Sequence, residues 1–162
     1  MEHGIHKPRV EASEANPRIY PLMREFSAYL ETTGIDAKLR EMIKVRASQI
    51  NRCAFCLDMH IREARAHGES DERLDLLCAW REAPFYTAAE RVALELTEAV
   101  TLIAENGVPD AVYERVREHF TAEQYVDLLA AINVINAWNR FMIAMGHTPP
   151  IRTGIHAKGN PE

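Results

Sequence analysis

The sequence predicts a single all-α domain, and three observations support that prediction. Apolar residues recur at helical spacing through most of the 162-residue chain, and no segment alternates polar and apolar residues as a half-buried strand does. At roughly 150 residues per domain, the chain has the length of one domain. Hydrophobic residues make up 47% of the chain and charged residues 27%, a composition typical of a globular protein with a buried core.

Helix-capping and helix-ending residues divide the chain into about six to seven helices. Asp, Ser or Thr precedes four of the expected helices, and Gly follows four of them. Thr87 with Glu90, and Thr121 with Gln124, have the spacing of capping boxes. The expected helices, in chain order, cover residues 22–33, 36–50, 53–67, 70–83, 87–106, 109–120 and 121–145.

These helices form one domain over residues 20–147, with a polar N-terminal arm at 1–19 and a polar C-terminal tail at 148–162. The final helix is apolar on several faces, so it is either central in its own domain or buried against another subunit. We expect the second arrangement and therefore a homo-oligomer. Three asparagines repeat every three residues on this helix and are expected to line a polar seam or to bond across a subunit contact: Asn133, Asn136 and Asn139.

Charge and residue usage exclude several classes of function. The chain has 19 basic and 24 acidic residues, a net charge of −5, which disfavours a nucleic-acid surface. No stretch approaches about 18 uncharged apolar residues, and the N-terminus lacks an apolar signal core, so neither membrane insertion nor export is expected. Three cysteines cannot form the disulfide framework of a secreted protein. We expect a protein of the reducing cytoplasm.

The segment with the clearest chemical pattern is Cys53-Ala54-Phe55-Cys56, followed by His60 one turn later. Residues three apart on a helix are close enough for their sulfurs to form a disulfide, which needs α-carbons roughly 4.4–6.8 Å apart. Cys53 lies at the expected start of a helix, where free amide groups and the helix dipole favour a thiolate. His60 is close enough to Cys56 to exchange a proton with it. The pattern predicts a dithiol with its own base.

Three other interpretations of this segment remain open. The two cysteines can be ordinary buried residues. They can bind zinc with His60 if Glu41, Glu63 or another chain supplies a fourth ligand. They can also act as a non-catalytic redox sensor. The third cysteine, Cys78, has no partner at metal-binding spacing and is expected in the core.

Glu41 is expected to join this segment if the chain reverses at Asn51-Arg52. Glu41 would then lie about 15 Å before the turn and His60 about 13.5 Å after it, so the two side chains come level on antiparallel helices. Glu41 could orient His60 and stabilise its charged form. The alternative is that Glu41 is a solvated helix charge paired with Lys44.

The spacing of Glu41, Cys53, Cys56 and His60 resembles the active-site motif of AhpD-like alkylhydroperoxidases, within the carboxymuconolactone decarboxylase family. The resemblance extends over residues 36–105 and again around Asn133–Phe141. It implies an all-helical trimer or hexamer and a thiol peroxidase cycle without metal, haem or other cofactor. The site differs in one respect: the archetypal peroxidase carries a histidine inside its CxxC, where this chain has Ala54 and Phe55.

The resemblance also implies a role for each residue. Cys56 attacks the hydroperoxide and becomes a sulfenic acid, Cys53 resolves it to a disulfide, and an external thiol or dithiol protein reduces the pair. Glu41 and His60 form the proton relay. The decarboxylase branch lacks the CxxC, so lactone decarboxylation is not expected.

Overall fold

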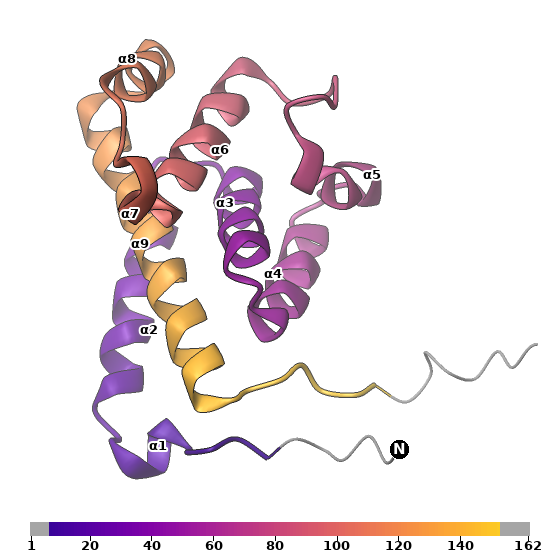
Figure 1. The fold of residues 1–162 in the computed structure, drawn as a ribbon, viewed down its shortest axis with the longest axis vertical. Coiled ribbons are helices and arrows are strands. Elements are labelled where there is room, and N and C mark those ends of the chain that lie inside the picture. Colours follow the sequence, from indigo (N-terminus) through magenta and orange to yellow (C-terminus); the bar gives the residue numbers. More distant parts are fainter. Residues whose placement is uncertain (1–6, 153–162) are drawn as a thin grey trace, which may run out of the picture.

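The computed structural model describes residues 7–152, and every regular element within them is helical (Figure 1). Six of these helices have ten or more residues, which agrees with the expected number, and the others are single turns. The α-helices are α1 (Ala12–Ala15), α2 (Ile19–Tyr29), α3 (Ala37–Asn51), α4 (Ala54–Ala66), α5 (Asp71–Asp75), α6 (Ala88–Thr101), α7 (Ile103–Asn106), α8 (Asp110–His119) and α9 (Ala122–Met145). Two 3₁₀ turns, η1 (Leu30–Thr32) and η2 (Leu77–Ala79), complete the set.

The expected caps form at the helix starts. Asp36 accepts hydrogen bonds from the backbone N–H groups of Lys38 and Leu39, at 2.9 and 3.2 Å, and so begins α3. Capping boxes are complete at the starts of α6 and α9, where side chain and backbone bond reciprocally. These bonds satisfy amide groups that have no partner within the helix.

The segment after α4 differs from the prediction of one helix over residues 70–83. Ser70 caps α5 as expected, but α5 ends at Asp75 and the chain tightens into η2. This change of pitch keeps Leu77 fully buried and leaves Cys78 exposed. The expectation that Cys78 belongs to the core was therefore wrong, because it assumed a regular helix through this position.

Helix α9 is the central element of the fold. Figure 1 shows it, in orange to yellow, running the length of the molecule, and it contacts α2, α3, α4, α6 and α8. Its apolar side chains on several faces are buried within the chain itself, among them Leu128, Ile132 and Ile135, each at most 1% exposed. The apolar residues on several faces of α9 are therefore explained by its central position in the domain.

The main apolar core lies between α3, α6, α8 and α9. A smaller cluster, at the C-terminal end of α9, contains both thiols of the CxxC together with Ala47, Ile135 and Met142. The dithiol is thus part of the packed interior.

Segments from both ends of the chain are attached to this frame. The backbone N–H of Arg9 donates to the carbonyl of Met145, at 2.7 Å, and α1 lies within the stretch expected to be an arm. After α9, Arg152 forms two hydrogen bonds, of 2.7 and 2.6 Å, to the carboxylate of Asp58 on α4. The remaining parts of the expected arm and tail, residues 1–6 and 153–162, lie outside the described residues.

Among residues 7–152, one helix is long and apolar enough to cross a membrane by length and composition, namely α9. Half of its most apolar 18-residue window is buried inside the fold, as in the core helix of a soluble protein. This is weak evidence for a membrane span.

Candidate active site

The candidate site depends on a sharp reversal between α3 and α4. Arg52 ends α3 in the left-handed backbone region, with φ 57° and ψ 39°, and is the one described residue other than glycine with a positive φ. Its conformation lets the N–H of Cys53 bond back to the carbonyl of Ser48, at 3.0 Å. The chain therefore turns back within two residues, and α4 packs along α3.

Cys53 and Cys56 form a close dithiol at the start of α4. Cys53 is the N-cap residue and Cys56 lies in the first turn, and their sulfurs are 2.9 Å apart and share a hydrogen bond. Both cysteines are unbridged, and each is 1% exposed. The structure thus brings the two thiols together as the CxxC spacing predicts.

The environment of the pair places its negative charge on Cys53. A hydrogen bond from the Cys56 thiol lowers the pKa of Cys53 to about 6, and the backbone N–H of Cys56 and the amide of Asn139 act in the same direction, against burial. The shared proton and burial raise the pKa of Cys56. At neutral pH the pair is therefore one thiol and one thiolate, with the thiolate at the helix N-terminus, where unpaired amide groups favour it.

A cavity of about 680 Å³ lies beside this pair and is closed on one side by α4. Cys56 lines it, whereas Cys53 does not. Aromatic and aliphatic residues form much of its wall, including Tyr20, Phe55, Met59, Ile135, Trp138 and Met142. Four polar residues from α3 and α4 also line it, namely Glu41, Lys44, His60 and Glu63. Cys56 is thus the sulfur with access to a molecule in the cavity.

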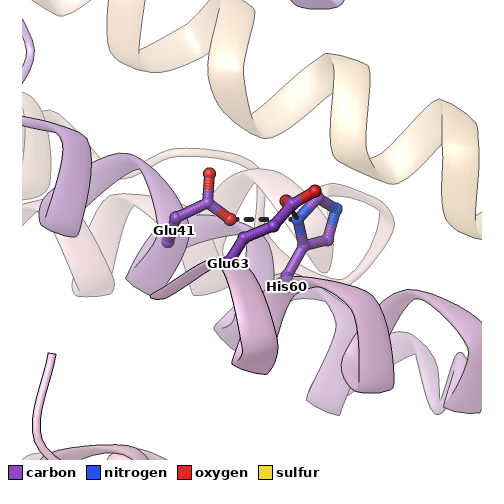
Figure 2. Close-up of side chains that lie close together, drawn as sticks. All are labelled: Glu41, His60 and Glu63. Atoms are coloured by element: carbon purple, nitrogen blue, oxygen red, sulfur yellow. Dashed lines mark hydrogen bonds and ion pairs between the residues drawn. The ribbon is translucent and has the colours of Figure 1, made fainter. Parts of the chain in front are cut away.

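Glu41 and His60 meet across the α3–α4 reversal, as Figure 2 shows. Glu41 Oε2 lies 3.0 Å from His60 Nδ1, and both side chains are less than 10% exposed. Burial disfavours the imidazolium, but hydrogen bonds with Glu41 and Glu63 outweigh burial and raise the pKa of His60 above its ordinary value. The predicted contact between these two residues is present in the structure.

Glu41 is also paired with Lys44, whose Nζ lies 2.6 Å from Glu41 Oε1. The alternative interpretation of Glu41 was therefore half right: the Lys44 pair exists, but the carboxylate is buried rather than solvated. Burial opposes ionisation, yet the hydrogen bond from His60 and the charge of Lys44 prevail and lower the pKa of Glu41 to about 2. Glu41 is a permanent anion at physiological pH.

Sequence reasoning missed the part that Glu63 and Asn139 take in this site. Glu63 Oε2 lies 2.7 Å from His60 Nδ1, and Glu63 had been considered only as a zinc ligand. Its spacing of three residues from His60 places both on one face of α4, which is the signal that could have identified it. From the sequence, Asn139 is expected only in a polar seam of α9 or at a subunit contact.

The asparagine seam is internal to the chain. Asn51 Nδ2 donates to the side-chain oxygens of Asn136 and Asn139, at 2.8 Å each, and Asn139 Nδ2 donates to Ser48 Oγ at 2.9 Å. These bonds fix the Asn139 amide so that its nitrogen faces the dithiol. Asn133 is exposed and bonds to its own helix.

The donor atoms do not gather as a Cys53–Cys56–His60 zinc site requires. Within residues 7–152, the group of His, Cys and acidic side chains whose ligand atoms lie within 4.8 Å of one another consists of Glu41, His60 and Glu63, without either sulfur. His60 Nδ1 is bonded to carboxylates, and the Lys44 ammonium already neutralises Glu41. The geometry favours proton chemistry over metal binding at this site.

The fold and the site together define an AhpD-like protein. The chain belongs to the carboxymuconolactone decarboxylase family, whose model matches residues 17–99. It is 49% identical over 139 residues to the uncharacterized protein YdfG of Bacillus subtilis, covering 86% of this chain and 95% of that protein. YnjA of Escherichia coli, also uncharacterized, is 31% identical over 131 residues, covering 80% of this chain and 71% of that one.

Solved structures show the same architecture. A protein of unknown function from Agrobacterium tumefaciens, suggested to be an antioxidant defence protein AhpD, is 39% identical and superposes with a TM-score of 0.87 over 90% of this chain and all of that one. An AhpD-core, peroxidase-related protein from Ralstonia eutropha superposes with a TM-score of 0.76 at 24% identity, over 88% of this chain and 77% of that one. The second likeness shows the fold alone.

The charge on Glu41 makes a testable contribution to stability. Its folded-state pKa of about 2 lies below the ordinary value of 4.5, so its ionisation stabilises the fold above pH 4.5, and this contribution is lost as the pH falls toward 2. We expect the free energy of unfolding of the wild type to exceed that of Glu41→Gln by an amount that shrinks by on the order of 3 kcal/mol over this range. Urea unfolding between pH 6 and 2.5 measures the difference. The control is Glu114→Gln, on exposed α8, and parallel curves for Glu41→Gln and the wild type would contradict the assignment.

Proposed function

We propose that this protein is a thiol-dependent peroxidase that reduces hydroperoxides through Cys53 and Cys56 and serves antioxidant defence. The observation that supports this most directly is the cavity, which is lined by both Cys56 and the buried His60–Glu41 pair. A purely structural cysteine pair does not need a base and a cavity beside it. The likeness to a 39% identical protein suggested to act in antioxidant defence is consistent with this function.

In the first step Cys56 acts as the nucleophile, because it is the sulfur that faces the cavity. Transfer of the shared proton across the 2.9 Å between the sulfurs moves the negative charge from Cys53 to Cys56. The Cys56 sulfur then attacks the O–O bond: an S–O bond forms, the O–O bond breaks, and the departing alkoxide takes a proton and leaves as an alcohol. Cys56 becomes a sulfenic acid.

In the second step Cys53 resolves the sulfenic acid. Its thiol gives up the proton that it gained in the first step, its sulfur attacks the Cys56 sulfur, the S–S bond forms and the S–O bond breaks. The departing hydroxide takes that proton and leaves as water. The N-cap position of Cys53 keeps its sulfur reactive at neutral pH, because its pKa is about 6. An external thiol or dithiol protein in the reducing cytoplasm then returns the pair to its dithiol form by exchange.

His60 and Glu41 form the proton relay for both steps. Glu41, ionised and buried, accepts a hydrogen bond from His60 Nδ1 and stabilises its charged form. Among residues 7–152 the other ring nitrogen, Nε2, has no protein hydrogen-bond partner, so it can serve a molecule in the cavity that His60 lines. Such an arrangement suits a general acid whose orientation is fixed by a carboxylate.

The cysteines are expected to have unequal roles. Cys56→Ser should abolish consumption of cumene hydroperoxide, whereas Cys53→Ser should react once and accumulate a sulfenic acid that dimedone traps. Mass spectrometry before and after one equivalent of peroxide measures both results, and the wild type should lose two mass units. If Cys56→Ser traps the sulfenic acid instead, the roles are reversed, and unreactive thiols with stoichiometric zinc would refute the peroxidase.

The relay predicts non-additive losses. Glu41→Gln and His60→Ala should each slow peroxide reduction, by up to the roughly 100- to 10,000-fold typical of acid–base groups. Because Glu41 acts through His60, the double variant should be little slower than His60→Ala alone. Stopped-flow peroxide kinetics give the rates. Multiplicative losses would show that Glu41 acts independently of His60.

We also propose that the protein is a homo-oligomer assembled through α2. This helix has no buried residue, and three apolar side chains on it are 41–57% exposed, namely Leu22, Phe26 and Tyr29. Single exposed apolar residues are common, but three in successive turns form a continuous face.

Light scattering should therefore give a mass well above 18.4 kDa at micromolar concentration. Phe26→Asp should shift the protein toward the monomer, while Leu102→Asp, at a residue 40% exposed outside this face, should not. A monodisperse wild-type monomer would end this proposal.

A further inference from the structure

Two carboxylates compete for one hydrogen atom on His60. Glu41 Oε2 lies 3.0 Å and Glu63 Oε2 lies 2.7 Å from the same ring nitrogen, Nδ1, and both contacts are drawn in Figure 2. An imidazole Nδ1 carries at most one hydrogen, so it cannot make a full hydrogen bond to each. The proposed relay uses only one of these carboxylates, so the second needs an explanation.

The two carboxylates differ in their access to solvent. The Glu41 side chain is 3% exposed and is held by Lys44, whereas the Glu63 side chain is 45% exposed. The pKa of Glu41 is about 2, so its carboxylate does not carry a proton at neutral pH. Of the two, Glu63 is the carboxylate that can both contact the buried ring and exchange protons with water.

The chemistry of the dithiol requires such an exchange. With one thiolate and one thiol at rest, the balanced oxidation is RS⁻ + R′SH + ROOH + H⁺ → RSSR′ + ROH + H₂O. One proton must therefore be supplied in each oxidation and removed again when the disulfide is reduced. Both sulfurs and the His60 ring are less than 10% exposed, whereas Glu63, which contacts the ring, is 45% exposed and offers this proton a direct route to solvent.

We propose that Glu63 is the proton entry to the site: it passes a proton from solvent to Nδ1 of the neutral His60 ring, and the charged ring then donates its Nε2 hydrogen into the cavity. When the disulfide is reduced, Nε2 takes up the released proton and the Nδ1 hydrogen leaves through Glu63. This role rests on the proposed peroxidase function and adds to it the route by which protons reach the site. Glu63 acts only through His60, and Glu41 holds the ring in place while the proton moves.

Several charged or titratable groups lie around this path. Lys44 faces His60 from α3 beside Glu41, and its charge opposes protonation of the ring. Apart from the dithiol, the other titratable or charged residues on the cavity wall are Tyr20 and Arg24 of α2, Glu31 of η1, His67 after α4 and His147 after α9. The test must therefore compare variants at fixed pH and ionic strength, so that these groups contribute equally.

The experiment uses Glu63→Gln, which keeps the size of the side chain and removes its ability to carry a proton, and Glu63→Asp, which keeps the carboxylate. Glu114→Gln, at an exposed position on α8, removes the same charge elsewhere. The first measurement is the rate of exchange of the His60 Nδ1–H with water by NMR on ¹⁵N-histidine-labelled reduced protein, which needs no oxidant. The second measurement is the rate of dithiol oxidation by cumene hydroperoxide, with imidazole varied from 2 to 200 mM at constant ionic strength. Over this roughly 100-fold range of concentration, a small acid such as imidazole can replace a missing proton carrier.

Glu63→Gln should slow ring N–H exchange by about tenfold to 100-fold, up to the lower end of the range for positioned acid–base groups. Its slowed oxidation should recover as imidazole rises, Glu63→Asp should retain part of both rates, and Glu114→Gln should match the wild type. Unchanged exchange in Glu63→Gln, or a slowed oxidation that imidazole does not restore, would overturn the proposal. If exchange depends on Glu63 but the wild type consumes no hydroperoxide, the proton entry stands and the peroxidase function fails.

Discussion

The site depends on one constraint, the left-handed turn at Arg52. A residue with a side chain adopts this conformation at a cost of roughly 1 kcal/mol or more, so surrounding structure must hold it there. The compensation comes from the packing of α3 against α4 and from Asn51, whose amide bonds two asparagines of α9. Because the reversal occupies two residues, Cys53 becomes the N-cap of α4, and the α3 carboxylate of Glu41 comes level with His60. The thiolate, the base and its carboxylate all follow from this turn.

The buried charges of the site are balanced within a few ångströms. Glu41 contacts both Lys44 and His60, so an anion that would be costly in the interior has two cationic or donor neighbours. Removing one member of such a group leaves an uncompensated buried charge, which is more destabilising than the intact group is stabilising. The consequence is a histidine held in one orientation, which an apolar core would not provide.

Much of this arrangement could be predicted from the sequence. The capping residues Asp36, Thr87 and Thr121 define helix starts because they satisfy backbone amides locally, and local bonds are readable from local sequence. The Glu41–His60 contact was predictable because a reversal at one point fixes the level of both helices. The end of α5 within residues 70–83 could not be predicted, because the η2 turn that follows depends on how Leu77 packs in the core. Glu63 was recognisable as a neighbour of His60, but its competition with Glu41 for one ring nitrogen depends on side-chain positions that spacing does not determine.

The placement of the two cysteines at the N-cap and in the first turn of α4 has a consequence for the folded state as a whole. A crosslink between residues three apart closes a loop of only four residues, and in the chain-entropy model it stabilises the fold by roughly 2 kcal/mol, against about 5 for a loop of a hundred residues. The reduced and oxidised proteins should therefore differ little in melting temperature, because the fold does not depend on the disulfide. A redox cycle of this kind can run repeatedly without loosening the domain, which suits a catalyst better than a switch that works by unfolding.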